Sequence, residues 1–100
     1  TLSFGDLILD TKRCVISSRE TKKTMQLGQK EFQLLEYMLR NQNQIITKEQ
    51  IVEKVWGFES EAEYNSAEVY VSFTRKKIKF IGSKVKIKAV RGIGYTLEEN

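Results

Sequence analysis

The 100-residue sequence contains no histidine, no proline and a single cysteine, Cys14. Histidine is the commonest acid–base side chain near neutral pH and the commonest metal ligand, so its absence disfavours Ser/His or Cys/His catalysis and most zinc sites. One cysteine cannot close an internal disulfide, which fits a reducing compartment. No apolar run exceeds three residues, whereas a bilayer span needs roughly 20. We expect one soluble, cytoplasmic domain over residues 1–100, without an enzymatic site, metal or cofactor.

The positive charge is concentrated towards the C-terminal end of the chain. Residues 1–64 hold nine Lys and Arg against ten Asp and Glu, whereas residues 65–100 hold eight against three. All eight of these basic residues lie between positions 75 and 91, with no acid among them. Such a block is either a solvated face or the footprint of a polyanionic partner, and composition alone leaves both interpretations open.

The N-terminal half predicts short strands followed by two helices. Short apolar runs separated by polar stretches in residues 2–27 predict about three antiparallel strands, one of them holding Cys14. Apolar residues then recur at spacings of three and four, which predicts a helix over about 29–41 and a second from Thr47 to Gly57. Gly28 with Glu31 resembles half a capping box, and Thr47 with Gln50 a complete one. The acidic segment 58–64 is predicted to be a loop.

A third helix is predicted over about 65–81, with Asn65 as its N-cap and Glu68 in its first turn. Spacings of four, three, four and three place one stripe of residues towards the core: Ala67, Val71, Thr74, Ile78 and Ile81. The opposite arc carries Val69, Ser72, Phe73 and Lys76. A valine and a phenylalanine between lysines on an exposed face indicate a binding surface rather than a solvated one.

The C-terminal segment 84–97 predicts a basic β-hairpin. Residues 84–90 alternate lysine with apolar residues, so one face of the strand would be buried and the other would present lysines. Residues 91–94 predict the turn, with Gly92 and Gly94 free to adopt positive φ, and residues 95–97 the returning strand. Strands, three helices and then a hairpin are the order of an α+β winged helix-turn-helix domain. In that geometry the third helix enters the major groove and the hairpin contacts phosphates or the minor groove.

Four motifs, in order, resemble the C-terminal effector domain of OmpR/PhoB-type response regulators. They are Leu27-Gly-Gln-Lys-Glu-Phe-x-Leu-Leu35, Thr47-Lys-Glu-Gln-Ile51 ending in Val55-Trp-Gly57, Val69-x-Val-x-x-x-Arg-Lys-Lys-Ile78 and Val90-Arg-Gly-Ile-Gly-Tyr95. The resemblance covers essentially the whole chain and implies a four-stranded N-terminal sheet, three helices and a hairpin. It also implies a receiver domain preceding Thr1, phosphorylated by a sensor kinase, and dimeric binding to tandem DNA half-sites. The resemblance further implies that RNA polymerase could be contacted through the loop 58–64, which could instead be a solvated connection.

The resemblance also assigns residues to DNA. The phosphate contacts that it implies are Lys48, Trp56, Ser66, Tyr70, Arg75 and Tyr95, and Lys76 joins them through its charge. Arg91 matches an arginine that enters the minor groove, and the base-reading positions are Val69, Ser72 and Phe73. Family members often carry arginine at position 72 or 73, where it can pair with guanine. Here the side chains suit thymine methyl groups, so we expect an A·T-rich site.

The sequence pattern is also compatible with several alternative roles for these residues. Trp56 and Tyr95 could belong to the core, and Phe73 could pack against the hairpin or a dimer partner. Thr74 stands where the family usually has leucine, so the core there would be thinner. The whole domain could instead be a winged-helix protein-interaction module, in which case the lysines of 75–91 would be incidental. Glu49 and Glu53 share a helix face but have no base or nucleophile beside them in the sequence pattern, which disfavours an enzyme.

Overall fold

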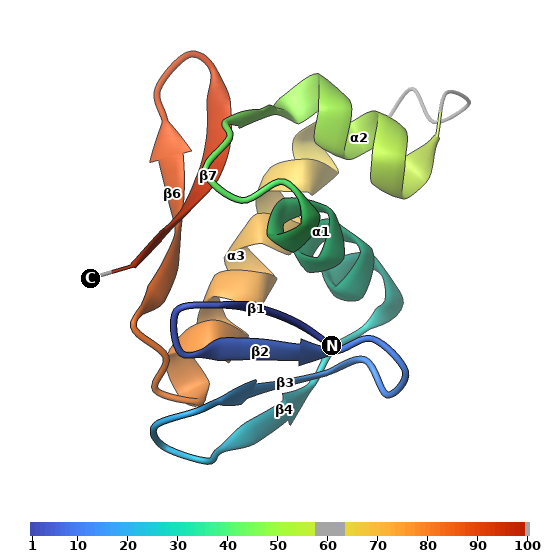
Figure 1. Ribbon diagram of the computed structural model, residues 1–100. Coiled ribbons are helices and arrows are strands. Elements are labelled where there is room, and N and C mark those ends of the chain that lie inside the picture. Colours follow the sequence, from blue (N-terminus) through green and yellow to red (C-terminus); the bar gives the residue numbers. More distant parts are fainter. Residues whose placement is uncertain (58–63, 100) are drawn as a thin grey trace.

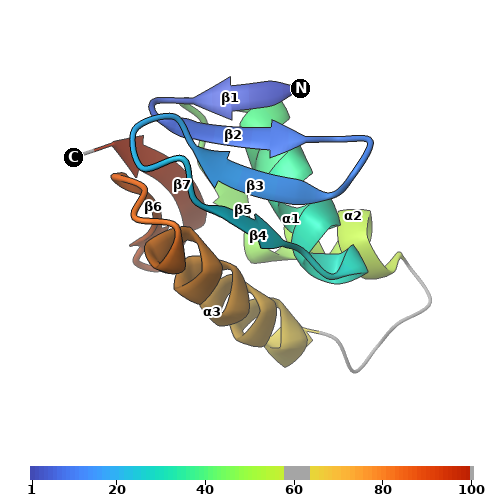
Figure 2. The ribbon, with the colours of Figure 1, turned by 90° about the horizontal axis from the view of Figure 1, so that it is seen from below.

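The N-terminal quarter of the chain forms an antiparallel four-stranded sheet. The computed structural model describes residues 1–57 and 64–99, except for the side chains of residues 64–66. The strands are β1 (Leu2–Phe4), β2 (Leu7–Asp10), β3 (Val15–Ser18) and β4 (Thr24–Gln26), in the order β1-β2-β3-β4 (Figures 1 and 2). Periodicity predicted about three strands and the family resemblance predicted the observed four. Cys14 was wrongly placed in a strand, because it lies in the turn before β3 with a φ of +56°.

Three helices follow the sheet: α1 (Gln29–Arg40), α2 (Lys48–Trp56) and α3 (Tyr64–Phe80). Both predicted caps are present, because the Gly28 N–H donates to Glu31 Oε1 at 2.7 Å and Thr47 and Gln50 form reciprocal bonds of 2.9 and 3.1 Å. The prediction that Asn65 caps α3 is wrong, since the helix already begins at Tyr64. Glu68 is therefore beyond the first turn and does not act as a capping residue.

The C-terminal hairpin, which we call the wing, consists of β6 (Val85–Val90) and β7 (Gly94–Glu99) and the turn between them. A two-residue strand, β5 (Ile46–Thr47), was not predicted and pairs with β7, so that the second sheet has the order β5-β7-β6. Gly92 takes a positive φ of +77° in the turn, whereas Gly94 lies in the strand opposite Thr47. Pairing of β5 with β7 joins the wing directly to the start of α2 (Figure 1).

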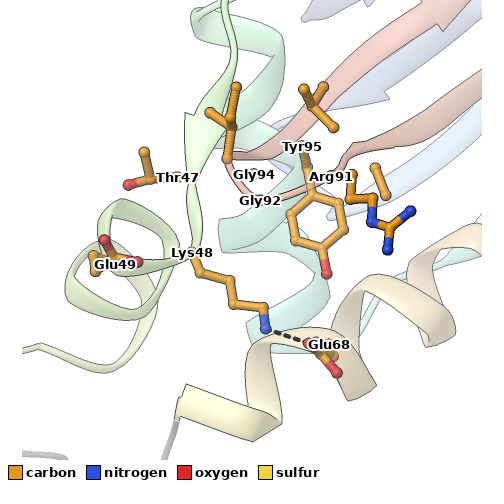
Figure 3. A pocket seen from close by; sticks show the side chains of 11 residues that line it. Thr47, Lys48, Glu49, Glu68, Arg91, Gly92, Gly94 and Tyr95 are labelled. Carbon is orange, nitrogen blue, oxygen red and sulfur yellow. Dashed lines mark hydrogen bonds and ion pairs between the residues drawn. The ribbon is translucent and has the colours of Figure 1, made fainter.

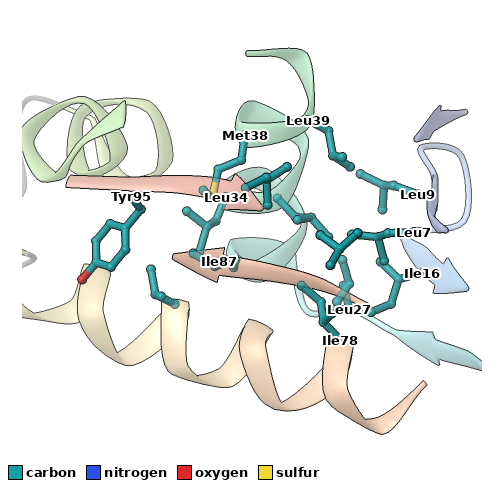
Figure 4. Packing of buried hydrophobic residues seen from close by; sticks show 14 of the residues in the cluster. Leu7, Leu9, Ile16, Leu27, Leu34, Met38, Leu39, Ile78, Ile87 and Tyr95 are labelled. Carbon is teal, nitrogen blue, oxygen red and sulfur yellow. The ribbon is translucent and has the colours of Figure 1, made fainter. Parts of the chain in front are cut away.

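The hydrophobic core lies between the first sheet, α1, α3 and the wing (Figure 4). The predicted inward stripe of α3 is confirmed, since all its members are buried: Ala67, Val71, Thr74, Ile78 and Ile81. Thr74 is completely buried, and its hydroxyl donates to the carbonyl of Tyr70 at 2.8 Å. The hydroxyl is thus satisfied within the helix, which explains how a polar residue is tolerated at this position.

Polar contacts at both flanks fix α3 against the rest of the domain. Lys77, which is half-buried, donates to Glu31 Oε1 at 2.6 Å and to the Gln26 carbonyl at 2.9 Å, so it ties α3 to the junction of β4 and α1. Beyond the end of α3, Ser83 donates to Asp6 Oδ1 at 2.8 Å. These contacts hold the helix at one angle to the first sheet.

Candidate nucleic-acid interface

The outer arc of α3 is exposed as the sequence predicted. Val69 and Phe73 leave 47% and 43% of their surface accessible, and Ser72 and Lys76 are exposed beside them. Phe80, about two helical turns beyond Phe73 on the same arc, is exposed as well. Apolar side chains of this size normally bury against the core, so their exposure in a row marks this helix face as a contact surface.

A row of aromatic rings supports this face. The rings of Trp56 and Tyr70 meet edge to face with centroids 5.6 Å apart, and Tyr70 and Phe73 do the same at 5.5 Å. The ammonium of Lys30 lies 5.4 Å from the centre of the Trp56 ring. Edge-to-face pairs restrict ring motion, so Phe73 is held in place from the end of α2. Trp56 is half-buried and packs against the core, in agreement with the alternative that it is a core residue.

The start of α2 brings a lysine to the flank of α3. Thr47 caps the helix and Lys48 is its first residue. The Lys48 ammonium forms an ion pair with Glu68 Oε1 across the gap between the two helices (Figure 3). The N-terminal end of a helix carries a partial positive charge, which favours an anion there.

The wing turn faces the same gap. Arg91 is exposed at the turn, and Tyr95 on β7 is core, with only 8% of its surface accessible. Its ring points from the wing towards Lys48 and Glu68 (Figure 3). Arg75 braces the wing against α3, because its Nε donates to the Ile87 carbonyl at 2.9 Å and its guanidinium lies 5.8 Å from the centre of the Tyr95 ring.

Together these elements enclose a hollow of about 480 Å³ between the start of α2, the flank of α3 and the wing turn. Its charged lining consists of Lys48, Glu49, Glu68 and Arg91. A second, shallower hollow of about 350 Å³ lies on the opposite flank of α3 and is lined mainly by apolar surface. Phe73 and Lys76 line this second hollow with Met25 and Phe80.

Residues 22–97 match the protein family described as "Transcriptional regulatory protein, C terminal". The chain belongs to this family. It is the OmpR/PhoB type that the four motifs indicated, and the match includes all three helices and both strands of the wing apart from the last residues of β7. This output domain, as we call it from here on, therefore comes from a transcriptional regulator.

Individual relatives agree with this assignment. The output domain is 42% identical over 98 residues to the transcriptional regulatory protein DltR of Streptococcus agalactiae, which covers 98% of this chain and 43% of that protein. It superposes on the C-terminal domain of the nisin resistance regulator NsrR with a TM-score of 0.79 at 33% identity, covering 97% of this chain and 95% of that one. The DNA-binding domain of AdeR, solved with an intercistronic region, gives 0.82 at 21% identity over 98% and 99% of the two chains, which supports the fold. The winged-helix class is thereby confirmed.

The predicted site residues divide between two locations. The 480 Å³ hollow brings together Lys48, Arg91 and Tyr95, which come from parts of the sequence more than 40 positions apart. The exposed arc holds Val69, Ser72 and Phe73 with Lys76 beside them. Phe73 and Lys76 also line the second hollow. Ser66 and residues 58–63 of the predicted loop 58–64 fall outside the described side chains, and Tyr64, predicted to end this loop, is instead the first residue of α3. The remaining predicted contacts, Trp56, Tyr70 and Arg75, support the arc or the wing.

Sequence reasoning missed two residues of this surface. Phe80 could have been found, because it follows Phe73 by seven positions and so shares its helix face. Glu68 was interpreted as a capping residue, and no sequence pattern links it to Lys48, its partner twenty positions away. Within the described residues, no helix is long and apolar enough to cross a membrane. The same residues contain no group of three or more acidic or cysteine side chains placed to hold a metal ion.

Proposed function

We propose that this output domain binds double-stranded DNA in a sequence-specific way, with α3 in the major groove and the wing at the minor groove and the phosphates. The observation that carries the proposal is the position of the exposed arc of α3 directly beside the hollow that holds Lys48 and Arg91. The major groove of B-DNA, about 12 Å wide, admits one α-helix, so a helix in the groove brings such flanking cations to the phosphates. Neither catalysis nor a cofactor forms part of this function, and its setting is the cytoplasm.

Base reading is assigned to the arc of α3 and to the wing turn. Val69 and Phe73 present apolar surface that fits the thymine methyl group, and Ser72 can bond to any base edge. Arg91 projects from an exposed turn and suits a narrow minor groove, which A·T-rich DNA provides. The proposed site is therefore rich in A·T pairs.

Phosphate contacts are assigned to both flanks of α3. Lys48 stands at the positive end of α2, where an anion is favoured. Tyr95 can reach the same hollow with its hydroxyl while its ring stays buried. The other proposed contacts are Trp56, Ser66, Tyr70, Arg75 and Lys76.

The chain spans 43% of the length of DltR. We infer a receiver domain elsewhere in the protein, controlled by a sensor kinase, and dimers on tandem half-sites. A contact with RNA polymerase through residues 58–64 belongs to the same proposal. These inferences rest on the family to which the chain belongs.

A protein-interaction module is the second candidate, and the apolar hollow lined by Met25, Phe73 and Phe80 favours it. Salt dependence separates the two functions. A DNA-binding domain releases counterions, so the logarithm of its affinity falls linearly with the logarithm of the salt concentration, by about 0.9 per neutralised phosphate. A protein-interaction module would either not bind duplexes or bind them with an affinity that does not depend on salt.

The test combines sequence selection with salt titration. Selection from a random duplex pool is expected to return an A·T-rich core, and a G-rich core would refute the base-reading assignment. Arg91→Ala and Lys76→Ala are each expected to reduce the salt slope by about 1. Lys12→Ala removes the same charge from the turn between β2 and β3 and should leave the slope unchanged. If the first two variants match wild type in both affinity and slope, the placement of α3 and the wing on DNA is wrong.

A further inference from the structure

The ion pair between Lys48 and Glu68 places an acid where the proposed function needs a phosphate. Both residues line the 480 Å³ hollow, and their side chains leave 26% and 55% of their surface accessible, respectively. The pair joins the first residue of α2 to the wing-facing flank of α3 (Figure 3). Lys48 is the only ion-pair partner of Glu68 within the described part of the chain. Lys48 is thus the cation that the Glu68 carboxylate faces across the hollow.

The surroundings of the pair are those of an anion site. The positive end of α2 lies behind Lys48, and Arg91 stands at the opposite rim of the hollow. A carboxylate and a phosphate oxygen are both anionic acceptors, and an ammonium group attracts either of them. A phosphate that enters the hollow to contact Lys48 would lie beside the Glu68 carboxylate, and the two negative charges would repel each other.

We propose that Glu68 is a built-in competitor of the DNA phosphate for Lys48. In the free domain its carboxylate neutralises the lysine, and on DNA it has to release it. This inference rests on the proposed function and adds a control of affinity to it. Because Lys48 enters the complex from an existing ion pair, its contact with phosphate yields less net counterion release than a free lysine would. Glu68 thus lowers affinity for every duplex alike, which makes the complex depend more on base contacts.

Two other roles for Glu68 predict different results. A carboxylate can accept a hydrogen bond from the amino group of cytosine, in which case removing its charge would weaken binding to one particular sequence. A purely structural ion pair would instead contribute to folding, and its loss would lower stability without changing the salt slope. Exposed ion pairs contribute little to stability, so the structural role is expected to be small.

The experiment compares Glu68→Gln with wild type on the selected duplex and on a scrambled duplex over a salt series. We expect Glu68→Gln to bind both duplexes about two- to fivefold more tightly at low salt, the range corresponding to one exposed ion pair. Its salt slope should be steeper by up to about 0.9, one additional phosphate equivalent. Glu36→Gln, which removes the same charge from the Glu36–Arg40 pair on α1, should leave the slope unchanged. Thermal unfolding of each variant verifies that it is folded.

A double-mutant cycle then tests whether the effect passes through Lys48. In the Lys48→Met background, the gain from Glu68→Gln should largely disappear. The inference is overturned if Glu68→Gln binds no better than wild type, if it weakens binding to one sequence, or if its full gain persists without Lys48. Failure of the proposed function looks different, because wild type itself would then show no salt-dependent binding to either duplex.

Discussion

Gly94→Ala should separate the wing from α2, although the change adds a single methyl group. A Cβ placed on Gly94 would lie 2.0 Å from the carbonyl oxygen of Ile46 and 2.8 Å from the Cα of Thr47. Real Cβ atoms essentially never approach another atom closer than 3.0 Å, so β5 and β7 would have to move apart by at least about 1.0 Å. Both obstructing groups are backbone, which cannot rotate away as a side chain could.

The expected cost follows from what that movement breaks. The pairing of β5 with β7 consists of two residue pairs, Ile46 with Tyr95 and Thr47 with Gly94. A backbone hydrogen bond contributes about 0.5–1.5 kcal/mol net to stability, and overpacking by a methyl group costs about 1–3 kcal/mol. We therefore expect Gly94→Ala to lower the free energy of unfolding by about 2–4 kcal/mol. Tyr95 adjoins the site of strain, so its packing in the core would suffer as well.

Urea unfolding measures this loss as a lower midpoint at an unchanged m-value. The folded fraction of the variant should also bind DNA with a smaller salt slope, because Lys48 and Arg91 would no longer face the same hollow. Gly28→Ala is the matched control, since its φ is −73° and a Cβ there would meet no backbone atom, only the side-chain carboxylate of Glu31 at 3.2 Å. It should cost less than about 1 kcal/mol, the usual range for a weakened helix N-cap. A loss below about 1 kcal/mol for Gly94→Ala itself would refute the reasoning.

Two further predictions concern stability. Burial alone would raise the pKa of Asp6, but hydrogen bonds from Ser18, Ser83 and the Lys84 N–H outweigh it and lower the pKa below its ordinary value. The ionised carboxylate therefore stabilises the fold above the unfolded-state pKa, and this contribution is lost as the pH falls through the folded-state pKa. Asp6→Asn should lower the free energy of unfolding by about 1–3 kcal/mol at pH 7. In urea unfolding at a series of pH values, the difference in stability between wild type and variant should shrink below about pH 4, and a difference that stays constant would contradict the assignment. Thr74→Val loses one hydrogen bond, from the Thr74 hydroxyl to the Tyr70 carbonyl, and should cost about 0.5–1.5 kcal/mol. Thr74→Leu should destabilise by about 1–3 kcal/mol because it adds volume at a fully buried site. A leucine variant that is more stable than wild type in thermal melts would instead show that the core is thin there.

The parts of the domain that the sequence predicted well are those governed by local periodicity. A helix repeats every 3.6 residues, so the buried stripe of α3 and its exposed arc follow directly from the spacing of the apolar residues. The wing was predictable for the same reason, since the lysines at 84, 86 and 88 alternate with buried Val85 and Ile87. The alternation fails at Ala89, which is exposed because the strand is approaching its turn. The base-reading residues proposed on α3, Val69, Ser72 and Phe73, lie on such a periodic element and could therefore be predicted from the sequence.

Features that depend on tertiary pairing left no such pattern. Strand β5 has two residues and exists only because β7 comes to lie beside it, about 50 positions later in the chain. Ser83 donates a hydrogen bond to Asp6, 77 positions away in the sequence, and neither residue type indicates which partner it will have. Glu68 was predicted to lie in the capped first turn of α3 because Asn65, three residues before it, is a good N-cap residue. The helix instead begins at Tyr64, before Asn65. Local rules cannot weigh a cap against the packing that sets the helix start.

The same distinction applies to the two kinds of DNA contact that we propose. Which side chains of α3 point outward is decided within the helix, whereas the distance from α3 to the wing cations is decided by long-range contacts. Arg75 links α3 to the wing through the Ile87 carbonyl, and Lys77 links α3 to the first turn of α1 through Glu31. Phosphates occupy fixed positions along the groove. Loss of either contact would therefore shift Lys48 or Arg91 relative to the phosphates, while the exposed arc of α3 would keep the same side chains. Sequence preference and salt dependence should accordingly respond to different substitutions in this domain.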